Sequence, residues 1–222
     1  ALIDAVCEGE QPENVTSLLF EDNASAYLTG LIAGRMTETN KVGFIGGMES
    51  PVISKFDYGF RAGVKAANPD AEVMVQYANS FTDSALGKTI ANQMHSKNAD
   101  IIFTCAGAVG IGAIEAAKEN GKKAIGVDQD QNSLAPENVI TSAMKNIDVS
   151  VEEMLSKVVD GSYKGGEIIV NTLAMNGVGI PQSSEKNVPP DVLTYVKEEA
   201  EKVKSGEVKV PATKEEFEQL NK

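Results

Sequence analysis

The sequence lacks tryptophan and contains one histidine and two cysteines among 222 residues. The cysteines, Cys7 and Cys105, lie far apart and fit neither a disulfide framework nor a metal-binding motif. We expect both to be buried, inert thiols. The histidine, His95, faces no obvious acid or nucleophile, so we expect a surface or packing role for it. The sequence therefore predicts no cofactor and no metal.

Positive charge is also scarce. Lys and Arg number 20 against 32 Asp and Glu, which gives a formal net charge of −12. Nucleic acids and anionic membrane surfaces favour clustered Lys and Arg, so this balance argues against both as partners. The sequence contains no transmembrane run and no cysteine placed for lipid attachment. It opens on the apolar segment ALIDAV without a starting methionine, and we expect an N-terminal segment to be missing.

The strongest positive signal is a strand, helix and strand unit at residues 100–131. Residues 101–105 and 124–127 are short apolar runs, typical of strands buried on both faces, and a segment with helical spacing separates them. Ligands of open parallel sheets bind at the carboxyl ends of the strands. The loops 106–112 and 128–131 are therefore the predicted binding loops.

Strands and helices alternate along most of the chain. Besides the two strands above, we expect strands at 1–6, 15–20, 41–45, 72–78, 139–144 and 167–173, and a loop or short strand at 176–182. Expected helices include 53–67, 84–97, 149–159 with Asp148 as its cap, and one from Pro189 and Pro190 to Lys204. The alternation predicts an α/β fold with a doubly wound parallel sheet.

Several motifs in this order resemble the basic membrane protein (BMP) family. Its members are bacterial surface lipoproteins that serve as purine-nucleoside-binding components of ABC transporters. The motifs are KVGFIGGM at 41–48, YGFRAGVKAANP at 58–69, SFTD at 80–83, DIIFTCAG at 100–107 and IGVDQDQ at 125–131. The segment EDNASAYLTG at 21–30 departs from the family's Glu-rich run, so the resemblance carries no ligand role over to that helix.

The resemblance implies a type I periplasmic-binding-protein fold, with two doubly wound parallel-sheet lobes joined by a hinge. The first lobe is expected to be incomplete here. Its remainder would be residues 1–39, the second lobe 40–141, a recrossing segment of the first lobe 142–165, and a C-terminal segment returning to the second lobe 166–222. It also implies a purine nucleoside as ligand, an ABC transporter permease as partner, and an N-terminal lipid anchor, absent from this chain, on the outside of the bacterial cell membrane.

The first two candidate site residues are Phe81, which precedes the unit at 100–131, and Gly107, which follows the first strand of that unit. Phe81 could pack on its own helix, which Thr82 or Asp83 would cap, or it could stack on a purine base. Gly107 belongs to a GxxGxG pattern rather than the GxGxxG of dinucleotide sites. We expect it to allow close approach of a small ligand to free amides at the helix start. The resemblance favours a ligand contact for Phe81 and Gly107.

The other two candidates follow later strands. Asp128 ends a predicted strand and could be a turn residue or an acceptor for ribose hydroxyls, with Asp130 as the alternative acid. Lys145 would be read as a surface lysine from its position alone. The family has a lysine in the run matching SAMKNID, and it points into the cleft to contact the ligand. Lysine offers three donors for that purpose.

We expect a binding protein rather than an enzyme, because the sequence shows no catalytic constellation. The alternatives are a type I binding protein for another small ligand, such as a sugar or signalling molecule, and a nucleoside-processing enzyme. A nucleoside hydrolase would need clustered aspartates around a metal, and only Asp128 and Asp130 lie together. The effector core of a transcription repressor would need a helix-turn-helix and a basic surface, which the sequence lacks.

Overall fold

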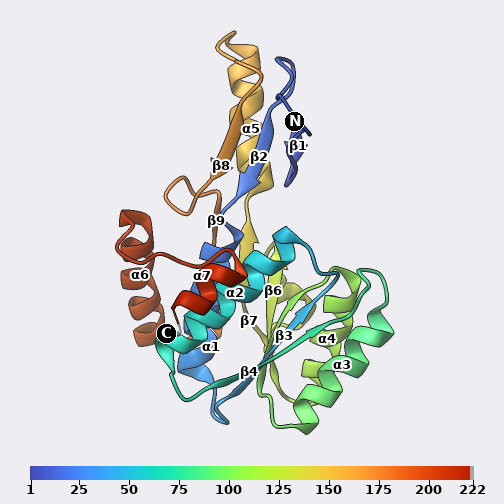
Figure 1. Cartoon of the computed structure of the whole chain (residues 1–222). Coiled ribbons are helices and arrows are strands. Elements are labelled where there is room, and N and C mark those ends of the chain that lie inside the picture. Colours follow the sequence, from blue (N-terminus) through green and yellow to red (C-terminus); the bar gives the residue numbers. More distant parts are fainter. Residues whose placement is uncertain (221–222) are drawn as a thin grey trace.

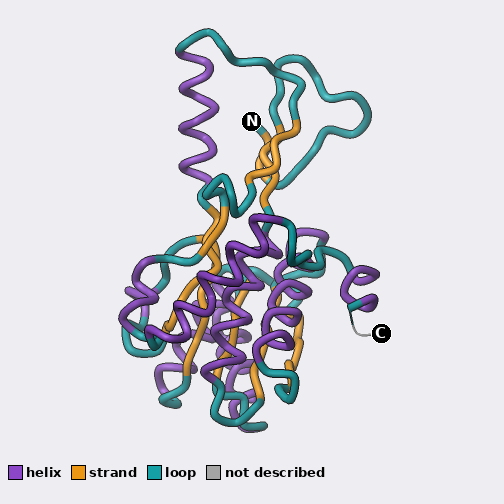
Figure 2. Tube along the Cα trace, turned by 90° about the vertical axis from the view of Figure 1, so that its left-hand side faces the viewer, coloured by secondary structure: helices purple, strands orange, loops and turns teal. Residues whose placement is uncertain are grey.

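The computed structural model describes residues 1–220 and contains two separate sheets. The smaller sheet has three parallel strands in the order β1-β2-β8, namely β1 (Leu2–Ile3), β2 (Ser17–Phe20) and β8 (Ile168–Asn171). Helix α5 (Ile147–Val159) lies alongside these strands (Figure 2). We call these four elements the small part. Figure 1 shows them as a slender extension that carries the N-terminus.

The larger sheet has six strands in the order β4-β3-β5-β6-β7-β9. Its strands are β3 (Lys41–Gly46), β4 (Glu72–Tyr77), β5 (Ile101–Cys105), β6 (Lys123–Asp128), β7 (Val139–Lys145) and β9 (Val178–Gly179). The first five are parallel, and the chain winds outward from β3 in both directions, as predicted. The segment 176–182 supplies β9, which pairs antiparallel with β7 and makes this sheet mixed.

Helices cover both faces of the larger sheet, and with it they form what we call the large part. Helices α3 (Ser84–Ser96) and α4 (Ala108–Glu119) share one apolar core with strands β3 and β5. Helices α1 (Asp22–Met36) and α2 (Pro51–Ala67) contribute to the other core. Helix α6 (Pro190–Ser205) packs against α1 and the short α7 (Lys214–Gln219) against α2. Two short 3-10 helices, η1 (Asn132–Leu134) and η2 (Gln182–Lys186), connect elements of the large part.

Local start signals in the sequence act as expected at several helices. The Asp83 side chain accepts a hydrogen bond from the Leu86 amide and caps α3. Thr213 and Glu216, which stand at capping-box spacing in the sequence, form a capping box at the start of α7. The expectation that Asp148 caps the helix at 149–159 is wrong. Helix α5 begins at Ile147 after the N-cap residue Asn146, so Asp148 lies inside the first turn. There its carboxylate faces the positive end of the helix dipole instead of capping it.

Two further expectations concern single buried residues. His95 is 8% exposed, and its Nδ1 lies 2.9 Å from the Ala99 carbonyl oxygen, so the packing role is the observed one. Cys105 is buried, but Cys7 is only half-buried, because it sits in the loop between β1 and β2. The expectation of two buried thiols is therefore right for Cys105 alone.

Helices α1 and α2 approach each other through glycine. A Cβ atom on Gly30 would overlap the Phe60 carbonyl oxygen, and one on Gly63 would overlap the Tyr27 carbonyl oxygen. Only glycine permits this backbone-to-backbone contact. Because α2 belongs to the large part, the contact fixes α1 there as well.

The chain crosses between the two parts three times, at points that differ from the predicted ranges. The first crossing lies at residues 20–22, because α1 packs on α2, and not at the end of the range 1–39. The second follows β7 at Lys145, just past the end of the range 40–141 and close to the expected recrossing. The third follows β8 at Asn171, since β8 pairs with β2 in the small sheet although the expected segment 142–165 ended before it. Of the last range, 166–222, residues 221–222 lie outside the described residues.

Asn171 connects these crossings. Its side-chain Nδ2 donates to the Leu19 carbonyl oxygen at 3.0 Å, and its Oδ1 accepts from the Ser150 hydroxyl on α5 at 2.8 Å. Its backbone carbonyl accepts from the Glu21 amide at 3.1 Å. The side chain is 3% exposed, so water cannot replace these bonds cheaply. One buried amide therefore ties β2, β8 and α5 together at the junction.

We predict that Asn171→Ala lowers the free energy of unfolding by about 1–3 kcal/mol, because it removes the buried side-chain hydrogen bonds to the Leu19 carbonyl and from the Ser150 hydroxyl. Urea denaturation of the full-length protein measures this loss. Asn14→Ala removes an exposed amide and serves as the matched control, with an expected change within about 0.5 kcal/mol. Equal stabilities of the two variants would show that Asn171 does not hold the junction.

Candidate functional site

A pocket of about 560 Å³ opens at the carboxyl ends of β5, β6 and β7, next to the second crossing. Its size falls within the range of small-molecule sites. Three of the four predicted site residues line it, Gly107, Asp128 and Lys145. The wall also includes Ile111 on α4 and Asp148 on α5, so both parts of the molecule contribute.

Gly107 forms the turn from β5 into α4. Its φ of 56° and ψ of −129° lie where residues with a side chain are strained, and a Cβ would lie 2.8 Å from the Phe81 carbonyl oxygen. The Ala108 amide already donates to that same carbonyl at 2.8 Å, and the Gly110 amide donates to the Gly107 carbonyl at 3.0 Å. These two amides of the helix start are thus not free donors, contrary to the expectation from sequence.

Phe81 lies beside Gly107 but does not belong to the lining of the pocket. Its ring packs so closely on Gly47 that a Cβ atom there would overlap it. The side chain nevertheless remains 37% exposed, which is high for a phenylalanine. The structure therefore places Phe81 at the edge of the site, with its ring held by the loop that follows β3.

Asp128 ends β6 with a φ of 66°, a conformation that aspartate tolerates better than most residues. Gln131 fixes this loop through two hydrogen bonds. Its side-chain Oε1 accepts from the Val127 backbone amide at 3.0 Å, and its backbone amide donates to the Ser142 hydroxyl at 3.1 Å. The alternative acid, Asp130, accepts from the Asn132 amide at 3.0 Å. Asp130 thus serves its own turn, whereas Asp128 lines the pocket.

Asp128 remains exposed, yet partial desolvation by the surrounding protein raises the pKa of its carboxyl group. The nearby Lys145 ammonium opposes this shift, and Asp4 adds to it. The Asp128 carboxylate is therefore less hydrated than a free surface acid, which favours hydrogen bonds from a ligand.

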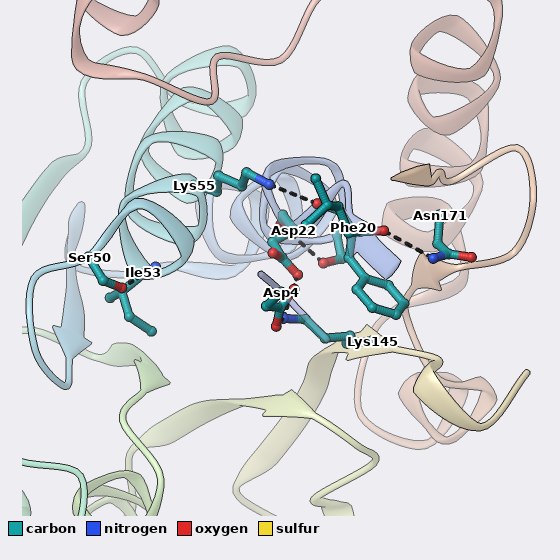
Figure 3. Close-up of polar contacts among 10 residues, drawn as sticks. Asp4, Phe20, Asp22, Ser50, Ile53, Lys55, Lys145 and Asn171 are labelled. Carbon is teal, nitrogen blue, oxygen red and sulfur yellow. Dashed lines mark hydrogen bonds and ion pairs between the residues drawn. The ribbon is translucent and has the colours of Figure 1, made fainter. Parts of the chain in front are cut away.

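Lys145 ends β7 and is buried, with its side chain 4% exposed. Its Nζ lies 2.6 Å from Asp4 Oδ2 and 3.1 Å from Asp22 Oδ1 (Figure 3). The ammonium is also 5.4 Å from the ring centroids of Phe20 and Phe56. Lys145 therefore borders the pocket as expected, but as the centre of an ion-pair cluster and not as a free side chain.

Burial and the neighbouring charges shift the pKa values of Asp22 and Lys145 in this cluster. Asp22 is fully buried, and desolvation, opposed by Lys145 and reinforced by Asp4, raises its pKa to about 7. Burial by itself would lower the pKa of Lys145, but Asp22 and Asp4 together raise it. Among the residues that the structure describes, neither carboxylate oxygen of Asp22 has a hydrogen-bond partner, so its contact with Lys145 is an ion pair only. Lys145 thus remains protonated at neutral pH, while Asp22 titrates there.

Asp4 and Asp22 were not identified from the sequence. Asp4 comes directly after β1 and Asp22 begins α1 just after β2, so each acid follows the carboxyl end of a strand. The rule that selected Asp128 could have selected both. Their contact with Lys145, however, depends on the crossing of the chain between the two parts.

Two absences apply to the described chain only. Within residues 1–220, no group of three or more His, Cys, Asp or Glu side chains is arranged to hold a metal ion. None of the helices in this range has the length and apolar character needed to cross a membrane.

Curated relatives and solved structures share this sequence and architecture. A CD4+ T-cell-stimulating antigen of Listeria monocytogenes is 41% identical over 90% of this chain and 60% of its own length. The ABC transporter nucleoside-binding protein BmpA of Lactococcus lactis is 37% identical over 95% of this chain and 64% of its own length. The chain thus spans less than two thirds of these relatives.

Among solved structures, an ABC transporter solute-binding protein from Aeropyrum pernix matches with a TM-score of 0.87 and 28% identity, over 98% of this chain and 72% of that one. The predicted fold class, α/β with parallel-sheet lobes, is thereby confirmed. The family model described as "ABC transporter substrate-binding protein PnrA-like" (Bmp) matches residues 1–214. The chain therefore belongs to the Bmp family of PnrA-like ABC transporter substrate-binding proteins, as its motifs indicated.

Proposed function

We propose that this chain forms most of an extracytoplasmic substrate-binding protein that binds a purine nucleoside and delivers it to an ABC transporter permease. The observation that carries the proposal is the convergence of Gly107, Asp128 and Lys145 on one pocket beside the crossings between two parts. The name of the Lactococcus lactis relative supports a nucleoside as the ligand. Anchoring of the whole protein to the cell membrane by an N-terminal lipid belongs to the same proposal.

The small and large parts correspond to the two lobes of this proposed protein, with the three crossings as the hinge. Their junction is narrow and consists of extended segments, which absorb rotation more readily than packed helices. A ligand that contacts both lobes stabilises the closed arrangement by its difference in affinity for the two states. Asp148 on α5 and Asp128 at the end of β6 supply pocket groups from opposite lobes.

The ribose hydroxyls of the nucleoside donate hydrogen bonds to an acidic side chain of the pocket. A carboxylate accepts two hydrogen bonds from vicinal hydroxyls, the role acids have in dinucleotide sites. Asp128 is suited to this role because its loop is fixed by Gln131 and its carboxylate is free of local turn contacts. Gly107 allows the ligand to approach the backbone without a side chain in between.

The base stacks on Phe81 at the edge of the pocket. Stacking on an aromatic ring is worth about 1–3 kcal/mol per base and tolerates different bases. The exposed fraction of the Phe81 ring and its support by Gly47 favour this use.

Titration calorimetry of the full-length protein tests the proposed function. Purine nucleosides, free purine bases and monosaccharides are compared, and mass spectrometry identifies any ligand carried through purification. Micromolar or tighter binding of a nucleoside is expected. Binding of monosaccharides alone would move the protein to another ligand class, and release of free base from a bound nucleoside would indicate an enzyme.

We predict that Asp128→Asn weakens nucleoside binding much more than binding of the free base. The substitution keeps the shape of the side chain but removes the charge, and charge-assisted hydrogen bonds are roughly twice as strong as neutral ones. Calorimetry with a nucleoside and its base measures the difference. Asp130→Asn is the matched control, because its acid faces its own turn. Equal losses for nucleoside and base would exclude Asp128 from ribose recognition.

We also predict that Phe81→Ala weakens nucleoside binding by about 1–3 kcal/mol, while Phe81→Tyr, which keeps a stacking ring, leaves the affinity close to that of the parent protein. Thermal unfolding measured in parallel separates binding from packing. A large fall in Tm with unchanged affinity would show that Phe81 only packs on Gly47 and its own helix.

A further inference from the structure

We propose that Asp22 is a positioning residue for Lys145: its buried carboxylate holds the ammonium at the junction of the two parts, aimed at the pocket. The geometric part of this proposal concerns Asp22 and Lys145 alone, and its effect on ligand binding rests on the proposed function. Asp22 lies in the segment where the sequence departs from the run typical of its family, so the resemblance suggested no role for it.

The position of Asp22 is fixed by its surroundings. It is the first residue of α1, directly after the first crossing, and none of its surface is exposed. Its Oδ1 is 3.1 Å from Lys145 Nζ. The rings of Phe20 and Phe56 flank the lysine at 5.4 Å and keep bulk water from the pair. Lys145 thus has little freedom to choose another orientation.

The donors of Lys145 divide between protein and pocket. An ammonium group has three N–H bonds, and Asp4 accepts one of them, whereas Asp22 lies 3.1 Å from the nitrogen as an ion-pair partner without a hydrogen bond. Lys145 also lines the pocket, so the N–H bonds that Asp4 does not use are available to a ligand. The charge of Asp22 holds the ammonium beside the pocket, so Asp22 acts on a ligand through Lys145.

The two carboxylates are not equivalent. Asp22 shares the large part with Lys145, whereas Asp4 belongs to the small part and its side chain is 24% exposed. A rotation of the small part would move Asp4 relative to Lys145 and leave Asp22 in place. Asp22 is therefore the permanent partner of the ammonium.

Stability alone does not account for Asp22. A fully buried carboxylate loses its hydration, and neither oxygen of Asp22 recovers a hydrogen bond within the described residues. Replacing buried ion pairs by well-packed apolar groups is often neutral or stabilising. An unpaired acceptor next to the proposed site is better explained by its effect on Lys145 than by its contribution to folding.

Protonation of Asp22 gives the proposal a specific signature. The charged and titratable groups around it are Lys145 on β7, Asp4 after β1, Lys55 on α2 and Cys105 on β5. Burial keeps the pKa of Cys105 well above its usual range, so this thiol stays neutral. With its pKa raised to about 7, Asp22 is mostly ionised above neutrality and mostly protonated below it. Only the ionised form makes the charge-assisted pair with Lys145.

Affinity and stability then depend on pH in opposite directions. Ionised Asp22 orients Lys145, so its contribution to nucleoside affinity is present above about pH 7 and fades at lower pH. The pKa of Asp22 is higher in the folded protein than in the unfolded chain, so its contribution to stability is present at low pH and is lost as pH rises toward 7. A purely structural residue would show the second trend without the first.

The test is Asp22→Asn in the full-length protein. We expect a nucleoside affinity about tenfold weaker than that of the parent at pH 8.5, which corresponds to one charge-assisted hydrogen bond, and a much smaller difference at pH 5.5. In the ligand-free protein, the ¹⁵Nζ resonance of Lys145 is expected to follow the titration of Asp22 and to lose that dependence in the variant. Asp22→Glu, which keeps the carboxylate, is expected to restore part of the pH dependence.

Asp57→Asn provides the matched control. Asp57 is a second buried carboxylate, 4% exposed on α2, and it contacts Arg61 and Tyr77 instead of Lys145. Its loss is expected to leave the pH profile of affinity and the Lys145 resonance unchanged. An Asp22→Asn variant with the same affinity loss at both pH values and an unshifted Lys145 resonance would overturn the proposal. If the parent protein binds no nucleoside, the proposed function fails, while the Lys145 resonance still decides whether Asp22 positions it.

Discussion

A buried ammonium at the junction of the two parts constrains the rest of the structure. The Lys145 side chain is almost completely excluded from water, and a charge in that position is tolerated only with partners. Those partners come from the end of β1 and the start of α1, so three distant segments must meet within 3.1 Å of one nitrogen. The meeting point also sets the wall of the pocket, because β7 delivers Lys145 there beside Gly107 and Asp128.

The alternation of elements was predictable because each buried parallel strand is a short apolar run and each connecting helix carries start and stop signals. The position of α1 in the fold, by contrast, was not predictable from the sequence. Its buried residues surround the helix almost completely, so no polar face indicates which neighbour it packs against. The choice is made by Gly30 and Gly63, whose missing side chains admit close backbone contact with α2. Complementary glycines on two helices are a property of their pairing, which neither segment reveals alone.

The candidate site was predictable to the extent that it follows the carboxyl-end rule. Gly107 and Asp128 satisfy that rule in the sequence, while Lys145 entered through resemblance to a family. The partners of Lys145 were not predictable in this way, because Asp4 is 141 residues away from it in the chain. Nor does a sequence indicate that the exposed-looking acid at the start of α1 is fully buried, because that burial depends on the crossing.

The balance of charge at the junction bears on the kind of ligand that suits the pocket. Three carboxylates, those of Asp4, Asp22 and Asp128, act on the single ammonium of Lys145, and Asp148 adds a fourth acid to the pocket wall. A phosphate group would meet repulsion from these acids, and the positive charge of Lys145 is already balanced by Asp4 and Asp22. A neutral ligand with hydroxyl donors meets no such penalty and satisfies the carboxylates by hydrogen bonding. The acids around Lys145 therefore favour a neutral ligand with hydroxyl groups over an anionic one, so the charges that hold the junction together also limit the kind of ligand that suits the pocket.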